Sequence, residues 1–246
     1  MSFTIYLLYT IAFVDLLAVG LIIPLLPNKV RSLDGNEIHV GLLGSLYAGC
    51  QLGSGPLIGS LSDLKGRKPV LAGTLIISGL AYANLGFSDS IFVILVIRSI
   101  LGIFKQTQVL TRALVPDYEK DQSLQGGIYG KMAAISGVGI TLGPVIGGHI
   151  VEDYPNLGFM FIASVVGSCF ILNACIVYFS LPNISTTKTN NSPEIKTNLI
   201  HRLFQNVHQS VVELYHIECI YVKQVRAAVS YSHRLNISVL SAANNL

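Results

Sequence analysis

Two charged residues lie inside long apolar runs and carry the clearest chemical signal in this 246-residue chain. Asp15 falls near the middle of one run and Arg98 near the middle of another. A charge at the centre of a bilayer costs at least about 2.5–3.5 kcal/mol, so each side chain should face a partner or a wet cavity. The depths of the two residues in their runs agree, which permits an Asp15–Arg98 pair that either locks two helices together or responds to a proton or a solute. Lys105 is expected to extend to the cytoplasmic edge of the membrane.

A short basic turn, GSLSDLKGRK, separates two of the apolar runs. Gly59 should let two helices approach closely. Asp63 should cap the next helix, where a carboxylate meets free amide groups and the positive end of the helix dipole. Gly66 suits a turn with positive φ. Arg67 and Lys68 should hold the turn on the cytoplasmic side and pair with carboxylates on moving partners.

A glycine-rich motif, GITLGPVIGG, occupies residues 139–148. Its residues of interest are Gly139, Gly143, Pro144, Gly147 and Gly148. Small residues allow close helix packing in membranes, and we expect these to bring their helix against a counterpart in a second half of the protein. Pro144 should add a kink whose freed carbonyl is satisfied locally. Gln51, in an earlier run, should bond either a solute or a neighbouring helix.

The composition is that of a membrane protein. Hydrophobic residues make up 51% of the chain and charged residues only 12%, about half the charged share of a typical soluble domain. The four cysteines lack metal-ligand spacing, and there is no nucleotide-binding loop or nucleophile–base set, so we expect no metal, no cofactor and no enzymatic activity. The net charge of +3 is too small and too dispersed to predict nucleic-acid binding.

The apolar runs predict an all-α, multi-pass membrane helix bundle with six transmembrane helices, since about 20 apolar residues cross a bilayer. The expected spans are 5–27, 39–61, 69–88, 91–110, 125–148 and 157–181. Lysine and arginine concentrate at 62–68, at 105–131 and after 181, which predicts that both termini are cytoplasmic.

A short internal repeat supports a 3+3 arrangement. GPLIGS begins at Gly55 and GPVIGG at Gly143, and this offset maps the first three spans onto the last three. Units of three spans enter the membrane from opposite sides, so the repeat is inverted, as in secondary transporters.

After residue 181 the composition changes. We expect a flexible cytoplasmic loop at 182–199, because Ser, Thr and Asn dominate it. Apolar residues at helical spacing then predict an amphipathic helix on the membrane surface at 200–217. Residues 218–246 have no assignment from the pattern.

Residues 1–181 resemble the N-terminal six-helix half of the major facilitator superfamily. The basic turn at 59–68 is similar to the family's signature loop, the motif at 139–148 to its fifth-helix antiporter motif, and RSILGIF from Arg98 to its fourth-helix motif. FVDLLAVGLIIPLLP, from Phe13, resembles the first helix of tetracycline-type drug/proton antiporters, and other segments resemble animal members of the family. The family's fold has twelve spans, so the resemblance covers one half.

The resemblance implies a secondary active transporter, or its N-terminal half, that moves a small organic solute by alternating access, with proton-coupled antiport as one form. Its partners would be the lipid bilayer, the solute, protons, and either a second six-helix half or a second copy of the chain. The alternative is a truncated membrane protein that does not transport, and either pairs with a partner half or is inactive.

Overall fold

The structure is a computed structural model that describes residues 3–154 and 158–182. All of these residues belong to one compact unit, Met1–Asn190. The predicted helix at 200–217 and tail at 218–246 lie outside the described residues, as does the loop at 182–199 apart from Pro182.

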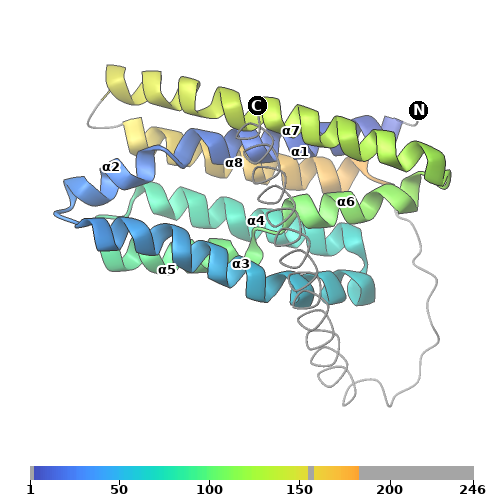
Figure 1. Ribbon diagram of the computed structural model, residues 1–246, viewed down its shortest axis with the longest axis horizontal. Helices are drawn as coiled ribbons and strands as arrows, with labels where there is room; N and C mark the ends of the chain where they lie inside the picture. The colour runs from blue at the N-terminus through green and yellow to red at the C-terminus, as the bar shows by residue number, and fades with distance from the viewer. Residues whose placement is uncertain (1–2, 155–157, 183–246) are drawn as a thin grey trace, which may run out of the picture. The chain divides into compact units, whose positions relative to one another are not determined.

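The described residues form eight α-helices that run along roughly one direction (Figure 1). The helices are α1 (Phe3–Ile22), α2 (Leu25–Ser32), α3 (Glu37–Lys65), α4 (Arg67–Gly86), α5 (Ile91–Phe104), α6 (Thr107–Tyr118), α7 (Gln122–Asp153) and α8 (Gly158–Ser180). The predicted spans match these helices, except that the first and fourth are each divided into two. The all-α helix bundle is therefore confirmed.

Within the described residues, five helical stretches are long and apolar enough to cross a membrane. They are Phe3–Ser32, Arg67–Gly86, Ile91–Tyr118, Gln122–Asp153 and Gly158–Ser180. The 29-residue α3 corresponds to the remaining predicted span. Its glycines, serines and Gln51 lower its hydropathy, which explains why it is not among the five.

Helix ends follow local sequence. Asn36 caps α3 and forms a reciprocal capping box with His39. Asp121 caps α7 by accepting hydrogen bonds from the Ser123 amide at 2.9 Å and its hydroxyl at 2.7 Å, and these bonds lower the pKa of the Asp121 carboxyl.

Three helix pairs dominate the packing: α1 with α7, α4 with α8, and α3 with α5. If the first three spans are exchanged with the last three, the α1–α7 pair becomes the α5–α3 pair, and the α4–α8 pair maps onto itself. The packing is therefore consistent with the 3+3 repeat.

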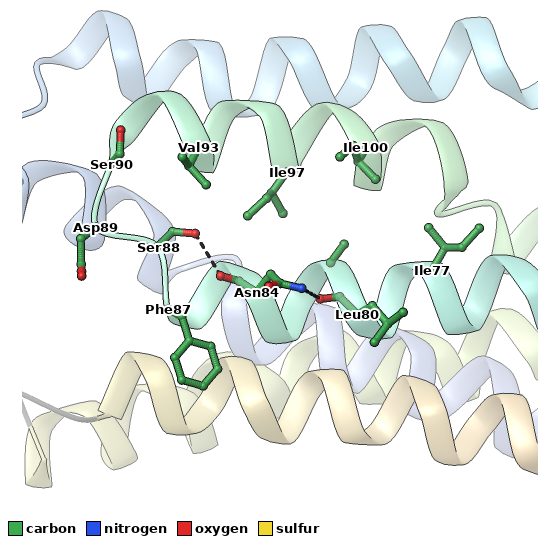
Figure 2. A pocket seen from close by; sticks show the side chains of 11 residues that line it. Ile77, Leu80, Asn84, Phe87, Ser88, Asp89, Ser90, Val93, Ile97 and Ile100 are labelled. Atoms are coloured by element: carbon green, nitrogen blue, oxygen red, sulfur yellow. Dashed lines mark hydrogen bonds between the residues drawn. The ribbon is translucent and has the colours of Figure 1, made fainter.

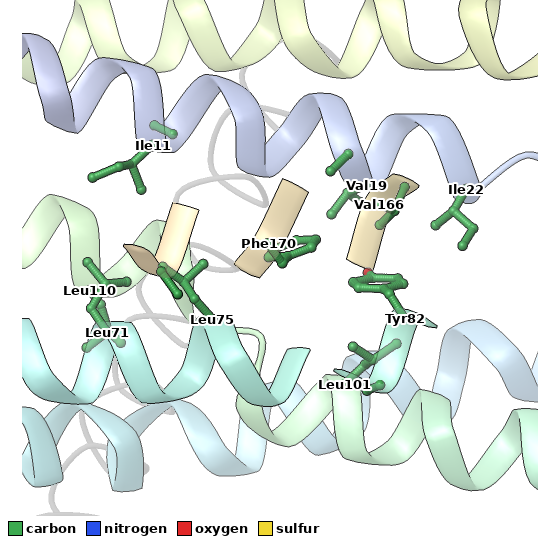
Figure 3. Packing of buried hydrophobic residues seen from close by; sticks show 14 of the residues in the cluster. Ile11, Val19, Ile22, Leu71, Leu75, Tyr82, Leu101, Leu110, Val166 and Phe170 are labelled. Carbon is green, nitrogen blue, oxygen red and sulfur yellow. The ribbon is translucent and has the colours of Figure 1, made fainter. Parts of the chain in front are cut away.

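The interior combines apolar packing with a small polar centre. Tyr82 of α4 stacks on Phe170 of α8, with ring centroids 5.2 Å apart, among buried leucines, isoleucines and valines (Figure 3). Large apolar side chains are also found on the outside, including Phe92 at 74% exposure and Leu52 at 70%. An apolar outer surface over a partly polar interior suits hydrocarbon as the surrounding solvent.

Candidate functional site

The polar centre is built around a buried ion pair between α1 and the break that separates α5 from α6. The Lys105 ammonium donates to both oxygens of the Asp15 carboxylate, at 2.7 and 2.8 Å. The Asp15 side chain is fully buried and that of Lys105 is 4% exposed. Gln108 adds a third hydrogen bond to the same carboxylate at 3.1 Å. A buried charge is tolerated when it is both paired and hydrogen-bonded, as here.

This geometry corrects the prediction for Lys105. The ammonium does not extend toward the membrane surface. It lies 5.1 Å from the centre of the Phe170 ring, in the interior of the bundle. The reason is the Asp15 carboxylate, whose charge offers the ammonium a closer partner than water at the membrane surface does.

The break between α5 and α6 places Lys105 in the centre. Helical hydrogen bonding stops there, which leaves backbone carbonyls without helical partners. Side chains of α3 satisfy them: Gln51 donates to the Lys105 carbonyl at 2.9 Å, and Ser54 donates to the Ile103 carbonyl at 2.9 Å. Gln106 returns a bond to the Gln51 carbonyl at 2.9 Å. Irregular backbone inside a membrane helix is stable only when buried groups satisfy it in this way.

Gln51 therefore bonds a neighbouring helix, which was one of its two predicted roles. Its side chain also faces a cavity of about 220 Å³ beside the ion pair, so the structure leaves it within reach of a solute. The cavity is lined by Leu16, Val19, Tyr47, Gln51, Lys105, Gln106, Gln108 and Val109.

The predicted Asp15–Arg98 pair is wrong for the described part of the chain. Lys105 occupies the carboxylate instead. Arg98 is 7% exposed, and no carboxylate of the described residues lies within ion-pair distance of it. Its guanidinium carbon lies 4.6 Å from the centre of the Tyr47 ring, a cation–π contact. Its Nε has no hydrogen-bond partner among residues 3–154 and 158–182.

Arg67 of the basic turn joins three helices, α3, α4 and α6. Gly66 lies directly between α3 and α4 and has φ +97°, so the positive φ predicted for this glycine is confirmed. Arg67 donates to Asp63 of α3 at 3.1 and 3.2 Å, to Asp117 of α6 at 3.1 Å, and to the Ala113 carbonyl. Its carboxylate partners thus belong to its own bundle.

Two details of the turn differ from prediction. The residue before α4 is Gly66, and no side chain caps this helix. Asp63 is still within α3, so its carboxylate cannot reach the first amides of α4 and binds Arg67 instead. Gly59 has open space beside it within the described residues, so the close helix approach expected there is not formed.

Lys68 reaches the end of α8. Its ammonium donates to the Leu181 carbonyl at 2.5 Å and lies 5.9 Å from the centre of the Tyr178 ring. Tyr118, at the end of α6, donates to the Pro182 carbonyl at 3.0 Å. These two bonds tie the residues that directly follow α8 to α4 and α6.

The glycine motif packs α7 against α1 inside the same bundle, not against a second half. Gly139, Gly143 and Gly147 are spaced four residues apart and share one helix face. A methyl group added at Gly143 would lie 2.5 Å from the backbone of Gly20, and one at Gly147 would lie 2.6 Å from the Leu21 carbonyl oxygen. Gly148 has open space beside it, and Pro144 is exposed.

A larger hollow of about 770 Å³ lies between α4 and α5 (Figure 2). Two of its polar side chains bond within their own helix turn: Asn84 donates to the Leu80 carbonyl at 2.8 Å, and Ser88 to the Asn84 carbonyl at 3.0 Å. A third, Asp89, accepts from Lys29 at 3.3 Å and is exposed, as are Leu80 and Val93 on the walls. The groove thus lies at the surface and has no buried charge, so the cavity beside the buried Lys105 is the better candidate site.

Long apolar helices around a buried ion pair and a broken helix define a multi-pass helical membrane protein. The chain belongs to the major facilitator superfamily, whose family model matches residues 8–233. Members of this superfamily are transporters and not enzymes, which confirms the prediction from the sequence that the chain is not an enzyme.

Several relatives of the chain are drug-resistance proteins. The chain is 29% identical over 217 residues to tetracycline resistance protein class E of Escherichia coli, covering 87% of this chain and 51% of the relative. It is 32% identical over 188 residues to class B of the same organism, covering 75% and 46%. Quinolone resistance protein NorA of Staphylococcus aureus is 25% identical over 83% of this chain and 53% of its own length.

A solved structure has the same fold. The human organic anion transporter MFSD10 (TETRAN) matches with a TM-score of 0.61 and 25% identity, over 73% of this chain and 48% of that one. The chain thus spans about half the length of the relatives it matches, and it corresponds to an N-terminal half of the superfamily fold.

Proposed function

We propose that this chain is a secondary active transporter, or the N-terminal half of one, that moves a small organic solute by alternating access. The observation that carries the proposal is the buried Asp15–Lys105 pair at the wall of a polar cavity. Broken helices and charged residues in membrane proteins mark solute and ion paths. The tetracycline and quinolone resistance relatives support an antiporter of drug-like solutes.

The ion pair offers a route to proton coupling. Protonation of Asp15 would remove its negative charge and weaken its hold on Lys105, whose ammonium would then be free to turn toward the cavity. A proton would thus change the charge at the wall of the cavity that takes the solute, and such a link between two ligands is what coupling requires.

The transport cycle needs a second bundle to close over the cavity. The apolar part of α7 has only 22% of its residues buried, against 56% for that of the Phe3–Ser32 stretch, so much of the α7 surface is uncovered within the described chain. We propose that this face meets a second six-helix half or a second copy of the chain. We also propose that both termini are cytoplasmic, because lysine and arginine concentrate at 62–68, at 105–131 and after 181.

The test is solute flux in proteoliposomes under an imposed pH gradient, with tetracycline and a quinolone as probes. The protein is used at full length, including any second half. We expect uptake that depends on the gradient and is lost in Asp15→Asn. The matched control is Asp89→Asn, which removes an exposed carboxylate from an outer turn and should leave flux unchanged. A protein that folds and inserts but moves neither probe would favour the alternative of a membrane protein that does not transport.

A further inference from the structure

The buried centre contains one more positive than negative charge. The charged side chains that are buried in the described part of the chain are Asp15, Arg98 and Lys105. Asp15 and Lys105 neutralise each other through their ion pair. The guanidinium of Arg98 has no counterion among the described residues.

The surroundings of Arg98 reduce the penalty of its burial only in part. The Tyr47 ring offers its negative face to the guanidinium. The Nε hydrogen has no acceptor in the described part of the chain, although a buried donor without a partner is costly. A cation buried in this way is stabilised by any anion that can reach it.

The cavity offers a path for such an anion. Tyr47 contacts Arg98 with its ring and also lines the cavity. The same wall carries the side-chain amides of Gln51 and Gln108, which in this structure donate to the Lys105 carbonyl and the Asp15 carboxylate. A rotation of the Tyr47 ring would open the cavity toward the guanidinium.

We propose that Arg98 is the solute-binding residue of this cavity, and that the transported solute is an organic anion whose carboxylate or sulfonate pairs with the Arg98 guanidinium. This inference rests on the proposed transport function and names its substrate class. A planar guanidinium forms two parallel hydrogen bonds with such a group, so the pairing is geometrically specific.

The test uses three probes with the same ring and different charges: naphthalene-2-carboxylate, 2-naphthamide and 2-naphthylmethylammonium. Binding to the purified full-length protein is measured by thermal shift and by equilibrium dialysis at constant ionic strength. We expect the carboxylate to bind at least tenfold more tightly than the amide or the ammonium. Arg98→Gln should remove this preference and leave amide binding unchanged, and Arg98→Lys should restore part of it.

The control is Arg112→Gln, which makes the same charge change on an exposed face of α6 and should keep the preference. Equal or tighter binding of the ammonium, or no binding of any probe, would overturn the anion site. The two proposals can fail independently. Carboxylate binding without flux of any solute would support the anion site and contradict the transport function. Flux of cations without carboxylate binding would support the transport function and contradict the anion site.

Discussion

Lys105 meets Asp15 through hydrogen bonds of 2.7 and 2.8 Å, although the two residues are 90 positions apart in the sequence. The contact joins α1 to the break between α5 and α6, so one ion pair links the first span to the fourth. The pair thus holds two spans together and lies beside the cavity, whose wall includes Lys105.

The first prediction concerns the strength of this pair. Asp15→Asn or Lys105→Gln alone leaves a buried charge without its partner, and each should destabilise the fold by about 3–5 kcal/mol. The double change should recover much of that loss, because no isolated charge remains. The measurement is a double-mutant cycle on thermal unfolding in detergent. As a control, the same cycle on the exposed Lys29–Asp89 pair should give a coupling of about 0–1 kcal/mol.

The second prediction is that Asp15 couples more weakly to Arg98 than to Lys105. Arg98 contacts Tyr47 and not the carboxylate, so Asp15→Asn and Arg98→Gln should have nearly additive effects on stability. A coupling energy as large as that of the Asp15–Lys105 cycle would restore the pairing predicted from the sequence and contradict this structure.

The third prediction compares glycines within one helix. Gly143→Ala would place a methyl group against the backbone of Gly20, and overpacking of this kind costs about 1–3 kcal/mol or more. Gly148→Ala, five residues later on an open face, should be neutral or stabilise by up to about 1 kcal/mol through helix propensity. Thermal unfolding of the two variants side by side checks this, and equal losses would mean that α7 does not pack on α1 through Gly143.

The fourth prediction concerns Arg67. Its guanidinium bonds two carboxylates and a backbone carbonyl at once, a geometry that the ammonium of lysine does not reproduce. Arg67→Lys should therefore destabilise the protein by about 1–3 kcal/mol. Asp117→Asn should cost more stability than Asp63→Asn, because the Asp117 side chain is 27% exposed and that of Asp63 is 63% exposed. The reverse order in thermal unfolding would mean that the bond of Arg67 to Asp63 of α3 contributes more stability than its bond to Asp117 of α6.

The fifth prediction concerns orientation. Asn183 begins an N-x-S sequon just after the last span, and it should carry no glycan if that side is cytoplasmic. The check is gel mobility with and without a glycosidase, with Asn183→Gln as the control. A glycosidase-sensitive shift that this substitution abolishes would reverse the proposed topology.

The sequence predicted the helix bundle well, because long apolar runs report membrane spans directly. It also located Asp15 and Arg98, since charges stand out in such runs. It did not predict the partner of Asp15, because which side chains meet depends on how each helix is rotated and where it breaks. The break beside Lys105 has no proline or glycine at 105–106 to announce it. The groups that stabilise it, Gln51 and Ser54, come from a helix about 50 residues earlier.

The glycine motif shows the same limit. Its spacing predicted a close helix contact, and the contact exists. Spacing alone does not say which helix supplies the other surface, and the partner proved to be α1 of the same bundle.

The Gly20–Gly143 contact also has a consequence for how the protein is made. About 120 residues separate the two glycines, which at 5–20 residues per second corresponds to roughly 6–24 s of synthesis. During that interval α1 resides at the insertion machinery or in lipid with its α7-facing groove unfilled, and for most of it with Asp15 unpaired. The strongly apolar remainder of α1 must hold the helix in the membrane until the ribosome has delivered Lys105 and then α7. Closure of the bundle around α1 therefore has to wait until Lys105 and α7 have been translated. A slower ribosome would prolong the exposure of α1 to quality-control proteases.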